Sequence, residues 1–227
     1  MTTSKPPPAA ASGDGRPESL SFTETVVETV SVAGVELELE HPADAEALVD
    51  EEAFGEDEFL PYWAEQWPSG VALAHHVAAS ELEGRTILEL GCGLGLPSLV
   101  AARLGATVVA TDWSADALAL LERNAARNNL ELTTLMADWR RHDAFAGIGS
   151  LDTVLGADLL YEERNVGPVS AVLRAVGAPA AIADPGRRHA GAFLDAMRGY
   201  GWTVDTKPDP RLPRGGIHRL EPAVRPS

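Results

Sequence analysis

The chain has 227 residues, 45% hydrophobic and 23% charged, which is the size and composition of one globular domain with additions. Its longest apolar stretches, such as Val71 to Ala79, are well short of the ~20 residues that span a bilayer, and no apolar run follows Lys5 as in a secretory signal. Cys92 is the only cysteine and the six histidines lack metal-ligand spacing, so we expect neither a disulfide nor a metal site. These features predict a cytoplasmic protein.

The negative charge is concentrated in one part of the chain. Between Pro17 and Gly84 there is no Lys or Arg, while 17 of the 34 acidic residues lie there, and the rest of the chain is nearly balanced. Such a surface repels phosphate backbones and attracts cationic partners, so we do not expect nucleic acid to bind. Two interpretations stay open, a solvated acidic face and the steering of a cationic substrate.

The first sixty residues are expected to be an extension of the main domain. Residues 1–19 are rich in Pro, Ala, Ser and Gly and predict a disordered tail, and residues 20–60 form an acidic extension. Within it, Thr23 to Glu40 alternates apolar and polar residues around Ala33-Gly34, which predicts a half-buried hairpin with Val35, Leu37 and Leu39 on one face and Glu36, Glu38 and Glu40 on the other. A short acidic helix is expected over Ala43 to Glu52. The hairpin either recognises the substrate or covers a sheet edge.

From residue 61 onward we expect one α/β domain. A helix is predicted over Val71 to Ala79, with Ser69 as a candidate N-cap. After Arg85, short apolar strands alternate with amphipathic helices, which predicts a mostly parallel sheet with helices on both faces. The expected strands are Thr86–Leu90, Thr107–Thr111, Leu132–Met136, Thr153–Gly156, Pro179–Ala183, Trp202–Asp205 and Gly216–Leu220.

A glycine-rich loop follows the first of these strands. Glu89 to Gly95 reads ELGCGLG, and glycines at 91, 93 and 95 permit a tight turn that a ligand can approach closely. A nicotinamide fingerprint requires a third glycine where Leu96 stands, and the chain contains no phosphate-binding loop ending in Gly-Lys-Ser/Thr. Glu89 itself is expected near a ligand amino group, because an ionised carboxylate on a buried strand needs partners.

Three further motifs follow successive strands, where the ligands of open α/β sheets bind. Asp112 ends the second strand, in the place of an acid that accepts hydrogen bonds from ribose hydroxyls. Asp138-Trp139 follows the third strand and suits an adenine ring, with a carboxylate for its amino group and a ring for its face. Asp158 to Tyr161 (DLLY) follows the fourth strand at the mouth of the expected cleft.

These motifs resemble those of the class I, seven-β-strand methyltransferases that use S-adenosylmethionine, which have a Rossmann-like fold. Pro61 to Gly70 (PYWAEQWPSG), Asp158 to Tyr161 and Asp184 to Arg187 (DPGR) are similar to the protein-lysine branch, above all to the electron-transfer-flavoprotein β-subunit lysine methyltransferases. The resemblance covers roughly residues 60–205. It implies methyl transfer to a lysine of a transiently bound protein. Small-molecule N-methyltransferases acting on amines or nicotinamide share several of these features and are the alternative.

The resemblance also implies a role for each candidate residue. Gly91, Gly93 and Gly95 would line the methionine portion of the cofactor, Asp112 its ribose, and Asp138 and Trp139 its adenine. Trp67 would close over the cofactor, with plain core packing as the alternative. Asp158 would capture and aim the incoming cation, with a base role left open, and Tyr161 would supply a ring wall or a hydrogen bond.

Several readings stay open at this point. Asp158 is alternatively a helix N-cap for the segment near Glu162, and Tyr161 a packed ring. Arg187 contacts either an acidic feature of the substrate or a neighbouring carboxylate. A module that binds S-adenosylmethionine without turnover is disfavoured by the intact motifs. DLLY stands where the amino-methyltransferases that modify adenine, cytosine or protein glutamine carry Asp/Asn-Pro-Pro-Tyr/Phe. Together with the acidic surface, this makes DNA or RNA methylation a weak third choice.

Overall fold

A computed structural model describes residues 24–48, 61–145, 148–223. The expected tail at residues 1–19 and the second half of the expected acidic helix lie outside the described residues. The described half of that helix is a short 3-10 turn, η1 (Glu46–Leu48). No helix within the described ranges is long and apolar enough to cross a membrane.

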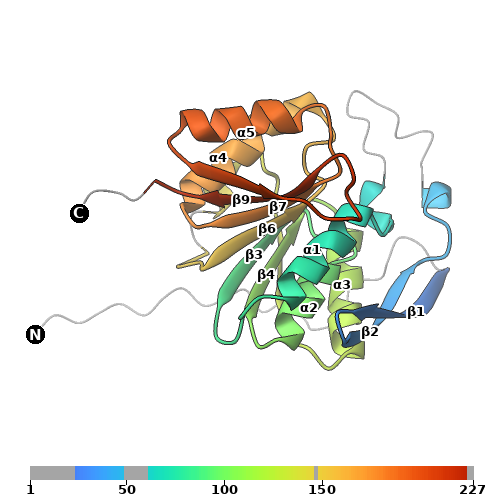
Figure 1. Ribbon diagram of the computed structural model, residues 1–227. Coiled ribbons are helices and arrows are strands. Elements are labelled where there is room, and N and C mark those ends of the chain that lie inside the picture. The colour runs from blue at the N-terminus through green and yellow to red at the C-terminus, as the bar shows by residue number, and fades with distance from the viewer. Residues whose placement is uncertain (1–23, 49–60, 146–147, 224–227) are drawn as a thin grey trace, which may run out of the picture.

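The main domain is built on a seven-stranded sheet with the order β5-β4-β3-β6-β7-β9-β8 (Figure 1). β9 pairs antiparallel with both neighbours, and the other neighbouring strands pair in parallel. The central strands are buried almost throughout, as a parallel sheet covered on both faces requires. The bounds are β3 (Thr86–Leu90), β4 (Thr107–Asp112), β5 (Thr133–Met136), β6 (Thr153–Ala157), β7 (Ala180–Asp184), β8 (Thr203–Lys207) and β9 (Gly216–Glu221).

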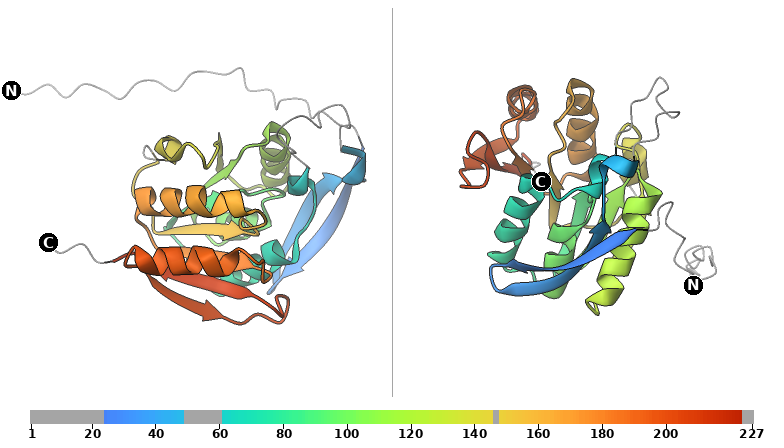
Figure 2. Two further views of the ribbon diagram at one scale, coloured as in Figure 1. Left: turned by 90° about the horizontal axis from the view of Figure 1, so that it is seen from above. Right: turned by 90° about the vertical axis from the view of Figure 1, so that its right-hand side faces the viewer.

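Helices cover both faces of this sheet and enclose two separate apolar cores. One core lies under α1 (Pro68–Ala78), α2 (Leu96–Arg103) and α3 (Ala115–Arg127), and the other under α4 (Val166–Val176) and α5 (Ala190–Gly199). The view from above in Figure 2 shows α4 and α5 side by side over the sheet. Shorter 3-10 turns, η3 (Tyr62–Ala64), η4 (His142–Phe145) and η5 (Glu163–Asn165), complete the connections. The predicted α/β fold is confirmed.

The start of α1 differs from the prediction. The helix begins at Pro68, three residues before the expected Val71, with Trp67 at the N-cap position and no side-chain cap. Proline favours the first helical turn because its missing N–H would be unpaired there in any case. Ser69 is therefore not the cap but a buried residue inside the helix, and its hydroxyl is free to bond elsewhere.

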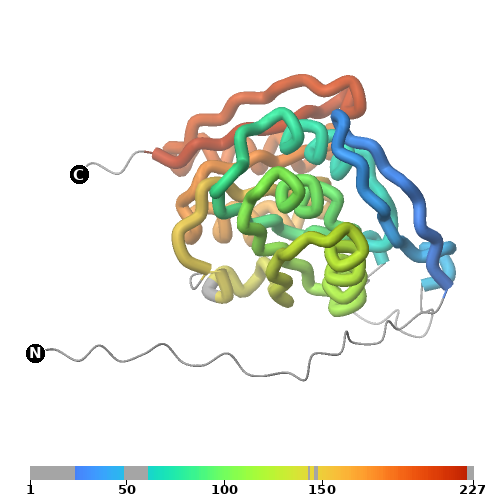
Figure 3. Tube along the Cα trace, turned by 90° about the horizontal axis from the view of Figure 1, so that it is seen from below, coloured from blue at the N-terminus to red at the C-terminus, as the bar shows by residue number. Residues whose placement is uncertain are grey.

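The N-terminal hairpin forms a small sheet of its own, from β1 (Thr25–Val32) and β2 (Val35–Pro42). Its two turn residues, Ala33 and Gly34, have φ of 51° and 89°, as a tight hairpin turn requires. The hairpin packs on helices, chiefly α3, instead of covering an edge of the main sheet (Figures 2 and 3). Leu37 and Leu39 are buried as predicted.

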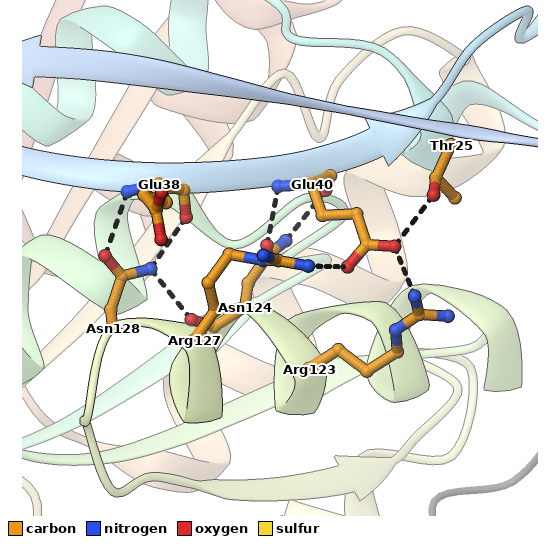
Figure 4. Close-up of polar contacts among 7 residues, drawn as sticks. All are labelled: Thr25, Glu38, Glu40, Arg123, Asn124, Arg127 and Asn128. Carbon is orange, nitrogen blue, oxygen red and sulfur yellow. Dashed lines mark hydrogen bonds and ion pairs between the residues drawn. The ribbon is translucent and has the colours of Figure 1, made fainter.

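Glu40 departs from the expected polar face, because it is buried against α3 (Figure 4). Its carboxylate accepts hydrogen bonds from Arg127 at 3.0 Å and Thr25 at 2.8 Å, and it is also paired with Arg123. Burial raises the pKa of Glu40, but the hydrogen bonds from Arg127 and Thr25 and the charge of Arg123 outweigh it, so the pKa lies below its usual value. The alternation of apolar and polar residues predicts the strand correctly, but it does not predict that Glu40 is buried and paired with Arg123 and Arg127.

Candidate functional site

A cavity of about 300 Å³ opens at the carboxyl ends of β3, β4 and β6. The chain passes from β3 outward to β5 and then returns to β6 on the other side of β3, so the cavity lies where the strand order reverses. This is the usual ligand site of open α/β sheets. The cavity is lined by Glu89, Gly91, Gly93, Gly95, Asp112, Trp139, Asp158, Tyr161 and Trp67 among the predicted residues, and also by Tyr62, Trp63, Glu65, Trp113, Glu162 and Arg187.

The glycine loop has the backbone that the sequence predicts. Gly91, Gly93 and Gly95 have φ of 60°, 51° and 70°, in the left-handed region that favours glycine. A Cβ on Gly91 would lie 2.7 Å from the ring of Trp139, and a Cβ on Gly93 would lie 3.1 Å from the carbonyl oxygen of Trp63. Larger residues at these two positions would therefore fill or deform the cavity.

Gly95 has an additional structural reason to be glycine. It precedes the first residue of α2, and a Cβ there would lie 2.4 Å from Cδ1 of Leu121 on α3. Gly95 thus permits the Leu121 side chain to pack against the start of α2, as well as lining the cavity.

Glu89 is buried at the end of β3, with 1% of its surface exposed. It accepts a hydrogen bond from the Ser98 backbone N–H at 3.0 Å and another from the Ser98 hydroxyl. Burial raises the pKa of Glu89 to about 8, in spite of the Ser98 hydrogen bonds and with a further contribution from the charge of Asp112. The carboxyl is therefore mostly protonated at pH 7, and a cation bound beside it would favour its ionised form.

Asp112 connects the end of β4 to the glycine loop. Its Oδ2 accepts the Gly93 N–H at 2.9 Å, and its Oδ1 accepts the Ser114 N–H at 3.0 Å. Burial raises the pKa of Asp112, and hydrogen bonds from the Ser114, Gly93 and Trp113 backbone partly offset it. The carboxylate thus holds the loop in shape while facing the cavity.

The structure does not bring Asp138 to the cavity wall. Its carboxylate pairs with Arg140, with Nε to Oδ2 at 2.8 Å, and this hydrogen bond lowers its pKa. Trp139 does line the cavity, and Trp113 lines it too. Sequence reasoning missed Trp113, although its position directly after the strand-end Asp112 was a usable signal.

Asp158 lies on the turn after β6, which is on the other side of β3 from β4. Its φ is 54°, which a non-glycine residue adopts only with strain, and its N–H donates to the Ala183 carbonyl at 2.9 Å. Arg187 holds the carboxylate side-on, with Nε to Oδ1 at 2.8 Å and Nη2 to Oδ2 at 3.1 Å. The Ser69 hydroxyl donates to Oδ2 at 3.2 Å. Asp158 is therefore not a helix cap, and Arg187 contacts a neighbouring carboxylate.

The turn that carries Arg187 is held by a second buried acid. Asp184, at the end of β7, accepts the backbone N–H groups of Gly186 and Arg187, both at 2.7 Å. Burial raises the pKa of Asp184, and these two hydrogen bonds partly offset it. The DPGR motif is thus a local turn that aims one guanidinium at Asp158.

Aromatic rings line the same cavity as Asp158. The ring centroids of Tyr62 and Tyr161 are 5.3 Å apart, and those of Tyr62 and Trp67 are 6.1 Å apart in an edge-on arrangement. Trp67 Nε1 donates to the Tyr62 carbonyl at 2.7 Å, and its ring centroid is 6.0 Å from the Arg187 guanidinium carbon. Trp67 is a cavity wall instead of a core residue. Sequence reasoning missed Tyr62, although it belongs to the quoted PYWA segment.

The chain matches a known family over the segment that forms this cavity. A family model described as lysine methyltransferase matches residues 62–183, which is more than half of the chain. The chain belongs to the lysine methyltransferase family. It is 33% identical over 134 residues to the electron transfer flavoprotein beta subunit lysine methyltransferase of Danio rerio, covering 56% of this chain and 51% of that one.

A second curated relative agrees with this family assignment, and a solved structure shares the fold. The protein N-lysine methyltransferase METTL21A of Mus musculus is 35% identical over 104 residues, covering 43% of this chain and 47% of that one. The chain thus spans about half the length of these curated relatives. Among solved structures, the 16S rRNA N2 G1207 methyltransferase of T. thermophilus, in complex with AdoMet and guanosine, has the same fold, with a TM-score of 0.58 at 17% identity over 88% of this chain and 50% of that one.

Proposed function

We propose that this member of the lysine methyltransferase family transfers a methyl group from S-adenosylmethionine to a lysine side chain of a protein. The observation that carries the proposal is one cavity lined by a glycine loop and two buried carboxyls after β3 and β4, and by Asp158 after β6 together with aromatic rings. The glycine loop and the two buried carboxyls suit a nucleoside with an amino acid tail, and Asp158 with the aromatic rings suits a cationic side chain.

The residues present fit the cofactor. Gly91 and Gly93 leave their backbone uncovered on the cavity wall, where side chains would block the methionine portion. Glu89 would accept hydrogen bonds from the cofactor amino group, and Asp112 from the ribose hydroxyls. Trp139 and Trp113 would wall the adenine. The proposed contact of Asp138 with the adenine requires its carboxylate to share or leave Arg140.

The chain's own residues position the acceptor and handle its charge. When bound, S-adenosylmethionine supplies a methyl group on a positively charged sulfur. The acceptor nitrogen needs its lone pair to form the new C–N bond, while the C–S bond breaks and its electron pair goes to sulfur. A lysine with a pKa of ~10.4 must first lose a proton to water, at a free-energy cost of about 4.6 kcal/mol at pH 7. Asp158 orients the acceptor amine, and the rings of Tyr62 and Tyr161 face the positive charge of the lysine before it loses its proton.

A protein acceptor is favoured over a small molecule by the rim of the cavity. Tyr62, Glu65 and Gln66 line the cavity and are themselves exposed, so the surface of a partner protein could contact them. The acidic first half of the chain would attract a cationic partner and repel nucleic acid. A transient protein complex and a cytoplasmic location belong to the same proposal.

Incubation with S-adenosylmethionine labelled in its methyl group, together with a lysate of the host cell, tests this function. We expect label in one or a few protein bands, and none with Gly93→Arg enzyme. Label confined to the low-molecular-weight fraction would replace the protein acceptor with a small amine and leave the cofactor site unchanged.

A further inference from the structure

We infer that Arg187 is a positioning residue that balances the charge of Asp158, so that Asp158 orients the acceptor amine without trapping it as an ammonium ion. The inference rests on the proposed function and goes beyond it, because it assigns a role to the arginine of the DPGR turn. The acceptor that this site holds is then a neutral amine, bound to Asp158 by a hydrogen bond.

The geometry ties the two side chains together more closely than a surface ion pair. The guanidinium contacts both carboxylate oxygens, at 2.8 and 3.1 Å, and the Asp158 side chain is only 10% exposed. Both partners line the cavity. Side-on arginine–carboxylate pairs combine charge with fixed geometry, which a lysine in the same place does not reproduce.

The turn holds Arg187 in this position from behind. Asp184 fixes the backbone N–H of Arg187, and its second oxygen, Oδ2, is buried without a hydrogen-bond partner among the described residues. Burial raises the pKa of Asp184, and the backbone hydrogen bonds from Arg187 and Gly186 partly offset this shift. The hydrogen bond with Asp158 raises the pKa of Arg187 further, so its charge persists at every assay pH.

Without Arg187, the negative charge of Asp158 would keep the acceptor amine protonated and so slow methyl transfer. An anion beside an amine favours its protonated form, typically by 1–3 pKa units, and each unit lowers the neutral fraction about tenfold. The other charged or titratable groups facing this end of the cavity are Tyr62 on η3, Tyr161 and Glu162 after β6, and Glu65 before α1, with Asp184 and His218 behind the turn. Glu162 is paired with Arg164, and burial lowers the pKa of His218, so none of these groups replaces Arg187 as the cation beside Asp158.

The first experiment needs no turnover. Enzyme saturated with S-adenosylhomocysteine is titrated at pH 7 with n-butylamine, which has the side chain of lysine, for wild type, Arg187→Gln and Arg188→Gln. Arg188 is the next residue, exposed and outside the cavity wall, so its variant loses the same charge without touching Asp158. We expect Arg187→Gln to bind butylamine about tenfold more tightly and Arg188→Gln to bind it like wild type. Equal or weaker binding by Arg187→Gln overturns the inference.

The second experiment measures kcat/KM for methyl transfer between pH 6 and 10. The midpoint of the rising limb should move up by about one pH unit in Arg187→Gln and stay near wild type in Arg187→Lys, which keeps the charge. Lower activity with an unmoved midpoint, or loss of S-adenosylhomocysteine binding, would make Arg187 merely structural. If wild type methylates no amine, the proposed function fails, and the butylamine titration still decides the role of Arg187.

Discussion

At the scale of single residues, Glu89 shows how burial changes the chemistry of a group. Its pKa of about 8 in the folded chain lies above its ordinary value of 4.5, so folding takes up a proton between these two pH values. Stability that depends on this proton is present at low pH and is lost as the pH rises through about 8.

Glu89→Gln should remove this pH dependence. Between pH 6 and pH 8, the ligand-free wild type should lose roughly 2 kcal/mol of unfolding free energy through Glu89, and the glutamine variant should lack that loss. Urea unfolding at the two pH values measures the difference. An equal loss of unfolding free energy between the two pH values in both proteins would show that Glu89 does not hold the proton.

Asp158→Asn should lower methyl transfer at least ~100-fold and leave S-adenosylhomocysteine binding unchanged. Asparagine tolerates the φ of 54° at this position, so the substitution removes the charge without adding backbone strain. Methyl transfer and calorimetric binding are measured beside Asp195→Asn, an exposed acid on α5 whose variant should behave like wild type. Normal turnover by Asp158→Asn would refute the role of Asp158 in orienting the acceptor.

Gly93→Arg should abolish cofactor binding, because its φ of 51° and the Trp63 carbonyl 3.1 Å from a Cβ leave no place for a side chain. Gly191→Arg is the matched control, since a Cβ on this helical glycine meets nothing within 4 Å. Calorimetry with S-adenosylhomocysteine compares the two. Cofactor binding by Gly93→Arg at normal affinity would contradict the assignment of the glycine loop.

At the scale of elements, the hairpin is held by side chains that imitate a neighbouring strand (Figure 4). Asn124 accepts the Glu40 N–H at 2.7 Å and donates to its carbonyl at 2.9 Å, and Asn128 does the same for Glu38 at 2.9 and 2.7 Å. Four residues of helix rise about 6 Å and two residues of strand about 7 Å, so the two spacings match.

Asn124→Ala should therefore destabilise the protein by about 2 kcal/mol, because it leaves the buried N–H and carbonyl of Glu40 without partners. Chemical unfolding followed by tryptophan fluorescence measures the change. Glu122→Gln, an isosteric change at an exposed position on the same helix, serves as the control. A loss no larger than that of the control would mean that the hairpin contributes little to stability.

Some elements could be predicted from the sequence more fully than others. The strands of the main sheet lie within about two residues of their predicted bounds, because buried parallel strands are continuous apolar runs between polar loops. Hairpin docking was not predictable, since it depends on Asn124 and Arg127 more than eighty residues away. In the same way, the local sequence predicts Ser69 as a helix cap, and only the fold places its hydroxyl 3.2 Å from the Asp158 carboxylate.

At the scale of the whole molecule, one sheet brings together groups that are far apart in the sequence. The glycine loop, Asp112 and Asp158 were predictable because each ends a strand, and the carboxyl ends of parallel strands meet at one edge. Asp138 lies outside the cavity wall, and its carboxylate is paired with Arg140, two residues later, which its position after a strand could not reveal. Pairing of Arg187 with a neighbouring carboxylate could be stated only as one of two alternatives, and its partner Asp158 could not be named, since the geometry depends on the turn after β7.

The measurement that tests the central claim most directly is the identity of the amino acid that receives the methyl group. Protein labelled by the wild-type enzyme is hydrolysed, and the label is separated against methyl-lysine, methyl-arginine and methyl-histidine standards. The account predicts label in methyl-lysine alone, and almost none when Asp158→Asn replaces the wild type. Label in another amino acid, or in no amino acid at all, would contradict it.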